Sequence, residues 1–129
     1  MAATHDTVTE HIKPLTEAGA IVRRGTLGAT TLAGQPVTLQ SDGFWDPTDA
    51  SAAQVTVAIA VQGGAAGARV DLVRYGPVVC MTGATPGTLI FASDTAGAFA
   101  ESAGTKDTII GYAESATVLF VQPQIIDLS

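Results

Sequence analysis

Two stretches of the chain, "VTLQSDGFWDPTDASAAQVTVAIAVQG" (residues 37–63) and "TLIFASDTAGAFAESAGTKDTIIGYAES" (residues 88–115), follow the same plan. In each, a β-prone segment leads into a Ser-Asp turn, a short return segment, a polar loop and an apolar strand. The Ser-Asp pairs are 52 residues apart, and "GYA" (111–113) follows "AIA" (58–60) at an offset of 53. The sequence therefore predicts two related β units.

Each unit continues into another strand, "RVDLVR" (69–74) in the first copy and "TVLFVQ" (117–122) in the second. "GPVVCMTG" (76–83) adds a further strand to the first copy. One such unit leaves open edges and an uncovered face, whereas two packed together form a small barrel or sandwich. We therefore expect an all-β protein whose body is a small β-barrel or β-tulip-like structure. Gly43 and Gly97 are expected to have backbone angles that favour glycine.

The β-rich domain is expected over residues 34–129, after an N-terminal arm at residues 1–33. Pro14 interrupts the only weak helical pattern, and glycines punctuate the rest of the arm. Two alternatives are open for residues 20–33. They order on a partner by adding a strand to a sheet edge, with the arm flexible before docking, or they pack on their own body as another strand.

Composition limits the function classes. Hydrophobic residues make up 47% of the 129-residue chain and charged residues 14%, which indicates one folded domain. A net charge of −6 argues against nucleic-acid binding. The single cysteine excludes an internal disulfide, and we expect neither a signal peptide nor a membrane span. These features predict a soluble protein made in a reducing cytoplasm.

Every candidate chemical site has a simpler structural interpretation. "QGGAAGAR" (62–69) precedes a strand and so predicts a hairpin turn, because a phosphate loop must open a helix. Cys80 lies in an apolar segment and is interpreted as a core residue. The Ser-Asp pairs suit turns, since the body of the domain contains no histidine to act as a base. We therefore predict no enzyme activity and no catalytic or cofactor-binding residues.

Metal binding is not favoured either. Among the carboxylates and imidazoles of the arm, only Asp6 and Glu10 have the helical spacing that aims two ligands at one metal. The aspartates of residues 42–49 do not follow the EF-hand pattern.

Phe44 and Trp45 are candidates for an interaction surface. Adjacent strand residues point to opposite faces, so the core should cover at least one of the two rings poorly. We assign both to a subunit or capsid interface, with core packing as the alternative.

The chain resembles the decoration, or cement, proteins of tailed-phage capsids over about residues 33–122. The first half, "AGQPVTLQSDGFWDPTDASAAQVTVAIAVQGGAAGARVDLVRYGPV", shows the patterns G-x-x-V, V-x-V-A-I-A and A-G-x-x-V-x-L-x-x-x-G. The second half, "GTLIFASDTAGAFAESAGTKDTIIGYAES", shows G-x-x-I-F and I-G-Y-A. It is also similar in plan to the lambda-type decoration proteins, which place a flexible arm before a small β-rich body.

The resemblance implies a structural virion protein. It would bind the major capsid protein on the outer surface of the head, as a homotrimer at three-fold or quasi-three-fold sites, without nucleic acid, membrane or cofactor. The arm residues expected to bind the capsid are Ile21, Val22, Arg23, Arg24 and Leu27. The alternative function is a small all-β ligand-binding or carbohydrate-binding module of a virion, with Trp45 as its aromatic platform.

Overall fold

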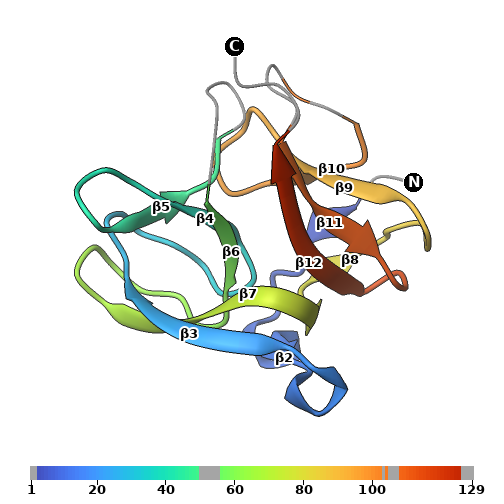
Figure 1. The fold of residues 1–129 in the computed structure, drawn as a ribbon, viewed down its shortest axis with the longest axis horizontal. Coiled ribbons are helices and arrows are strands. Elements are labelled where there is room, and N and C mark those ends of the chain that lie inside the picture. Colours follow the sequence, from blue (N-terminus) through green and yellow to red (C-terminus); the bar gives the residue numbers. More distant parts are fainter. Residues whose placement is uncertain (1–2, 50–55, 103, 105–107, 126–129) are drawn as a thin grey trace.

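The computed structural model describes residues 3–49, 56–102, 104 and 108–125, and the structural statements below concern these residues. The chain is all-β, as predicted (Figure 1). Its N-terminal elements are β1 (Thr4–His5), η1 (Thr9–His11), β2 (Lys13–Pro14), η2 (Thr16–Ala18) and β3 (Ile21–Thr26). The remaining strands are β4 (Pro36–Leu39), β5 (Trp45–Pro47), β6 (Val57–Ala60), β7 (Arg69–Val79), β8 (Met81–Thr82), β9 (Leu89–Ala92), β10 (Phe99–Ala100), β11 (Thr108–Ala113) and β12 (Val118–Ile125).

The duplication predicted from the sequence is confirmed by the strand order. The main sheet runs β10-β9-β11-β12-β7-β6-β4-β5 and curls strongly into a half-barrel. Read from its two ends, the order is the same: a short hairpin strand, its partner, the central strand of the unit and then the last strand. The two units join where β7 and β12 pair antiparallel. Pairing the last strands covers an edge that each unit alone would leave open.

The backbone register also repeats, with one correction. Pro36 lies opposite Ile59 in the first unit, and Leu89 lies opposite Tyr112 in the second, which confirms the offset of 53 for the central strands. Ile59 also lies opposite Val73, and Tyr112 lies opposite Phe120. The alignment of the last strands was wrong by one residue, because it made Val121 the counterpart of Val73. The β11–β12 hairpin sets this register, and its closing hydrogen bond runs from Glu114 N–H to the Val118 carbonyl over 2.9 Å.

The turns and the long strand β7 show what glycine does in this fold. Gly43 and Gly97 have φ angles of 87° and 77°, as predicted. The two strands expected over residues 69–74 and 76–83 are instead one strand, β7, followed by β8. Gly76, with φ at 102°, bends β7 without ending it. The part of β7 before this bend pairs with β6 and β3, and the part after it pairs with β12 and β2.

Two hydrophobic cores lie on opposite sides of β6. Val57 and Ile59 enter the larger core, which both units and the N-terminal segment build together, whereas Ala58 and Ala60 enter a smaller core. Successive side chains of a strand point to opposite faces, which places these pairs of residues in different cores. The smaller core is closed by a parallel bridge between Leu27, just after β3, and Trp45 of β5. The first unit therefore wraps almost fully around its own core.

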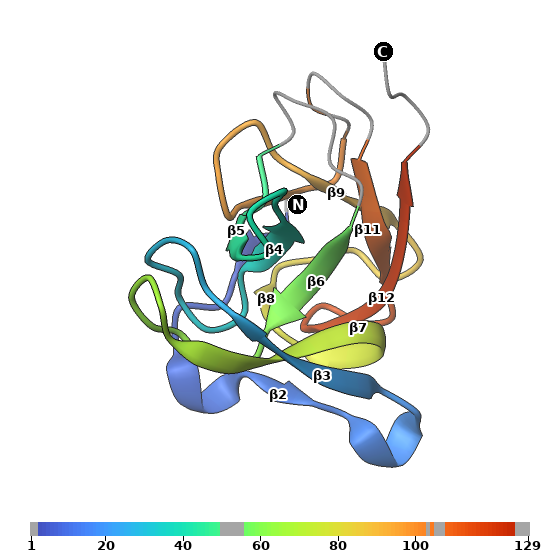
Figure 2. The same cartoon turned by 60° about the vertical axis from the view of Figure 1, so that its left-hand side comes forward.

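The N-terminal segment belongs to the sheet. All six residues of β3 pair antiparallel with β7, while β2 pairs with the far end of β7 and β1 pairs with β8. Figure 2 shows β3 running along β7 at the base of the molecule. Of the two alternatives for residues 20–33, the structure shows the one in which the segment packs on its own body.

Candidate interaction surface

The five arm residues proposed from the sequence fall into different environments. Ile21 is 52% exposed, and Arg23 and Arg24 are exposed as well. Val22 is half-buried against the larger core, and Leu27 is fully buried in the smaller one. Leu27 therefore contributes to folding, and the expectation that its side chain meets a capsid is corrected, whereas the capsid role of half-buried Val22 stays a prediction. Ile21, Arg23 and Arg24 lie at the surface.

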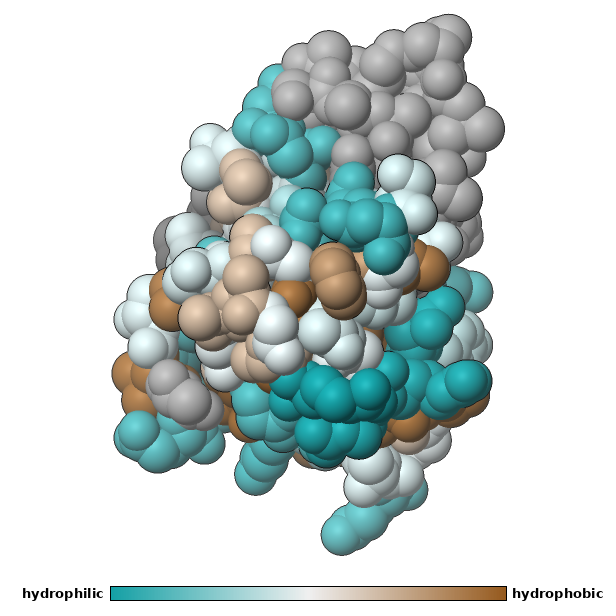
Figure 3. All heavy atoms as spheres, turned by 90° about the vertical axis from the view of Figure 1, so that its left-hand side faces the viewer, coloured by the Kyte–Doolittle hydropathy of each residue, from teal (hydrophilic) through white to brown (hydrophobic). Residues whose placement is uncertain are grey.

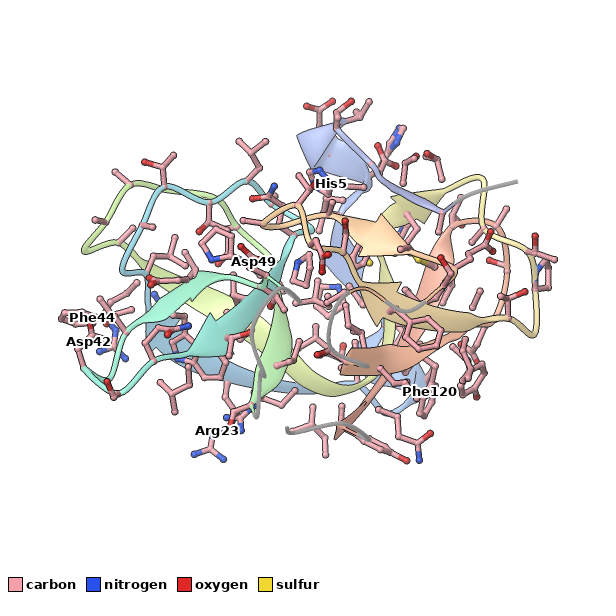
Figure 4. All side chains as sticks on the ribbon, turned by 90° about the horizontal axis from the view of Figure 1, so that it is seen from above. His5, Arg23, Asp42, Phe44, Asp49 and Phe120 are labelled. Atoms are coloured by element: carbon pink, nitrogen blue, oxygen red, sulfur yellow. The ribbon has the colours of Figure 1, made fainter. Side chains whose placement is uncertain are left out.

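Arg24 holds β3 against β7. Its Nη1 donates to Asp71 Oδ1 over 3.1 Å, and its Nη2 donates to the Arg69 carbonyl over 3.4 Å. Gln62 fixes the same aspartate by donating from Nε2 to Oδ2 over 3.1 Å. Such an exposed pair contributes little to stability, but it leaves Arg24 engaged. Arg23 makes no ion pair with any described residue and projects from the side of the molecule in Figure 4.

Phe44 and Trp45 point to opposite faces, as expected for neighbours at the start of a strand. Phe44 is 44% exposed, whereas Trp45 is buried in the smaller core with the Arg74 guanidinium 5.2 Å from its ring centroid. The assignment of Trp45 to an interface is therefore corrected, and its ring cannot serve as a carbohydrate platform. Phe44 lies with Leu39 and Asp42 at the end of the β4–β5 hairpin, and these three residues are called the hairpin tip below.

A row of apolar side chains runs from β3 and β7 across the outer face of the second unit, and the sequence did not predict it. The rings of Tyr75 and Phe120 meet edge-to-face with centroids 5.3 Å apart, and those of Phe120 and Tyr112 stack at 5.2 Å. Ile21 lies opposite Tyr75 on β3, and Leu89 lies opposite Tyr112 on β9. Because paired residues of an antiparallel sheet point to the same side, the five form one continuous row. This row is called the aromatic stripe below.

The aromatic stripe is unusual for a chain with a net charge of −6. Ile21, Tyr75 and Leu89 are 52%, 43% and 48% exposed, and the other two side chains are half-buried. The stretches 75–79, 89–92, 108–113 and 118–125 contain no charged residue. At roughly 150–250 Å² for an aromatic side chain, the stripe exposes an apolar area on the order of 400 Å². Depletion of charge together with enrichment in tyrosine and phenylalanine is typical of the centre of a protein interface.

The duplicated fold explains why this face is uncovered. Leu89, Tyr112 and Phe120 form a cross-strand triplet in the second unit. The equivalent triplet in the first unit is Pro36, Ile59 and Val73, and all three residues are buried. Ile59 and Val73 enter the larger core, where they are buried among residues of both units and of the N-terminal segment. The triplet of the second unit has no such cover among the described residues.

The remaining candidate sites are structural. The carboxylate of Asp6 is buried, and it accepts hydrogen bonds from the Val8 N–H and from His11 Nδ1, both over 2.9 Å. Nearby, His5 Nε2 forms a hydrogen bond with the Ala33 carbonyl. The Val8 bond lowers the pKa of Asp6, burial opposes it, and His11 adds to the lowering. No group of three metal-ligating side chains gathers in the described part of the chain.

Cys80 is completely buried, and this burial raises the pKa of its thiol well above the usual value. Two open hollows of about 390 and 380 Å³ are lined by residues 30–33 with Gly63 and Gly64, and by residues 13–18. They hold no paired catalytic groups among their lining residues. No helix in the described ranges has the length and apolar character needed to cross a bilayer.

Comparisons with protein-family models and with curated proteins gave no match for the chain. Exposed apolar side chains of the described residues gather in two places, the aromatic stripe and the hairpin tip. Sequence alternation could have indicated the stripe, since Leu89 and Tyr112 each adjoin buried residues, but the aromatic contacts join strands that are distant in sequence.

Proposed function

We propose that the chain is a non-enzymatic structural protein of a tailed-phage virion. It binds the major capsid protein on the outside of the head as a homotrimer, at three-fold and quasi-three-fold sites, and stabilises the shell. The resemblance of residues 33–122 to decoration proteins supports the proposal. The curled, duplicated sheet is consistent with the small β-rich body that this resemblance implies.

The observation that carries the proposal is the aromatic stripe. A protein that reinforces a shell must form contacts of sufficient area with neighbouring subunits, and it needs no reactive centre. The stripe provides an uncharged apolar surface on a rigid sheet, where little conformational entropy is lost on binding. Several such weak contacts act together on a multivalent shell, because the first contact raises the effective concentration of the others.

Head binding tests this function directly. Heads assembled from the major capsid protein of the same phage are mixed with the chain, sedimented and heated. The intact chain should co-sediment at a fixed number of copies per head and raise the temperature at which the heads rupture. If the chain fails to co-sediment at any concentration up to saturation of the assay, the proposed function is wrong.

A matched pair of leucines tests the role of the stripe. Leu89 and Leu32 are similarly exposed, at 48% and 56%, but only Leu89 lies on the aromatic stripe. We expect Leu89→Ser to weaken head binding at least tenfold, while Leu32→Ser leaves it within twofold. Equal binding by both variants would show that the stripe takes no part in attachment.

A further inference from the structure

We infer that Arg23 of β3 and Arg74 of β7 form a binding site for a carboxylate, which an aspartate or glutamate side chain of a partner protein supplies. The two arginines lie beside the ring of Trp45, on the face of the β3–β7 pair that the smaller core occupies. The site uses no residue of the aromatic stripe, so it does not depend on the proposed head binding.

Basic residues are concentrated in one layer of this acidic protein. Of the six lysines and arginines, five lie on β2, β3 and β7, and these three strands carry a single acidic residue, Asp71. Figure 3 faces the β5 end of the molecule and shows the most hydrophilic side chains gathered in its lower part, at the height where β3 and β7 run in Figure 1. This layer therefore attracts anions, although the whole chain has a net charge of −6. The five residues are Lys13, Arg23, Arg24, Arg69 and Arg74.

The two faces of the β3–β7 pair differ in how their charges are balanced. On one face, the Oδ1 atom of Asp71 accepts from Nη1 of Arg24 over 3.1 Å. On the other face, Arg23 lies opposite Leu72, and Arg74 follows two residues further along β7. Neither Arg23 nor Arg74 makes an ion pair with a described residue. Like charges on adjacent strands repel each other, so an anion between these two guanidinium groups would relieve the repulsion.

Register and packing bring the two side chains close together. Arg74 lies two residues from Leu72, the partner of Arg23, so the arginines are diagonal neighbours at a spacing that long side chains span. Trp45 lies against the same face of β3, because a Cβ on Gly25 would be only 2.7 Å from Nε1 of its ring. Gly25 and Arg23 are two residues apart on one strand and face the same side. Glycine at this position thus allows the ring to lie beside both arginines.

Trp45 prepares the site for an anion. The guanidinium of Arg74 lies 5.2 Å from the centroid of the ring, and tryptophan is the aromatic residue that attracts a cation most strongly. The ring itself is buried and bridged to Leu27, so it is a rigid support. A guanidinium held in this way loses less entropy when its N–H groups bind a carboxylate. The indole N–H, on the β3 side of the ring, donates to no described residue and offers a further donor.

The open shape of the site favours a protein side chain as its occupant. Small ligands bind in hollows that enclose most of their surface, and neither of the two hollows described above includes Arg23 or Arg74. Arg23 is exposed and Arg74 is half-buried, so water screens a free anion there. A carboxylate on a partner protein comes with further contacts of its own, and its two oxygens match the fork of a guanidinium.

Binding of a labelled peptide to the chain alone tests the site. The probe is a dye-labelled tetraglutamate peptide, followed by fluorescence anisotropy at low salt, with labelled tetraglutamine as the neutral control. Arg23→Gln and Arg74→Gln should each weaken binding of tetraglutamate about tenfold. Arg24→Gln is the matched variant, because it removes the same charge from the same strand but from the face that Asp71 neutralises. It should change binding by less than about twofold.

Two further measurements keep the test independent of folding. Arg74→Lys retains the charge and the alkyl stem beside Trp45, and it should still weaken binding about fivefold because lysine lacks the planar fork. Trp45 is the single tryptophan, so its emission should change as tetraglutamate binds to the wild type. Thermal melts of each variant show whether the fold is intact.

The contrary outcomes are distinct. Equal binding of tetraglutamate and tetraglutamine, or an equal loss for Arg24→Gln and Arg23→Gln, would refute the site. Inorganic phosphate that displaces tetraglutamate at the same or a lower concentration would overturn the assignment to a protein carboxylate in favour of a free anion. Each of these results leaves the proposed function standing, because head attachment is tested separately through Leu89 on the aromatic stripe.

Discussion

Replacing Gly111 by alanine should strongly destabilise the protein. Gly111 lies in β11 beside a register irregularity, between Ile90 of β9 and Val121 of β12. A Cβ at this position would overlap the carbonyl oxygen of Phe120, and it would lie 2.9 Å from the carbonyl carbon of Phe120 and 3.0 Å from the nitrogen of Gln122. All three atoms belong to the backbone of β12, which cannot move away without disturbing its pairing with β7.

The loss of stability expected for Gly111→Ala is large because the new Cβ would meet backbone atoms and not side chains. Overpacking a core usually costs about 1–3 kcal/mol, when side chains can rearrange. Here the obstacle is backbone paired on both sides, so we expect a loss of about 3 kcal/mol in the free energy of unfolding. For a domain of this size, that loss lowers the melting temperature by roughly 10–15 °C. Thermal melts followed by circular dichroism, together with urea titrations, measure both quantities.

Gly43→Val provides the matched comparison. Gly43 has φ at 87°, and a Cβ there would meet no atom within 4 Å. Its substitution therefore introduces only left-handed backbone strain, about 1–2 kcal/mol. Gly111→Ala should lower the melting temperature clearly more than Gly43→Val. The reverse order, or an unchanged melt for Gly111→Ala, would show that the β11–β12 packing described here is incorrect.

Three further predictions concern the N-terminal segment and the core. Because the pKa of Asp6 is lowered in the fold by Val8 and His11, its charge stabilises the fold above the unfolded value of 3.8 and this stabilisation is lost as pH falls through the lowered pKa. Asp6→Asn should thus lower the melting temperature at pH 7, with a gap to the wild type that closes in acid; a constant gap would contradict this. Deleting residues 1–26 should unfold the body, read by near-ultraviolet circular dichroism, since it removes β3; a folded remainder would restore the tether hypothesis. The thiol of Cys80 should react with a maleimide only in denaturant, and fast native labelling would contradict its burial.

Local patterns were enough to predict the fold class and the repeat. The alternation in residues 57–60, the Asp-Gly turn at Gly43 and the repeated apolar strand each depend on near neighbours, so single-sequence reasoning finds them. The extent of β7 was not predictable in this way, because Gly76 reads as a break. Only the pairing of its two halves with different strands shows that the chain continues through it.

The candidate surface was predicted only in part. Ile21, Arg23 and Phe44 are exposed, as an interface requires, but Leu27 and Trp45 bridge each other and close the smaller core. Nothing local distinguishes a tryptophan that caps a core from one that faces a partner. The ring contacts of the aromatic stripe likewise join residues on β7, β11 and β12, and they depend on long-range register.

The two copies of the repeat differ most where their surroundings differ. At the position of Val73 in the first unit, the second unit has Phe120, and at that of Ile59 it has Tyr112. The first pair is buried inside the molecule, where a larger side chain would overpack the core. The second pair faces outward, where the same enlargement adds contact area and meets no internal neighbour to displace. If folding alone had shaped the second unit, polar residues at these positions would suffice. Aromatic side chains on an uncharged, outward face are typical of protein interfaces, and this difference between the two copies supports the proposed attachment of the second unit to another protein surface.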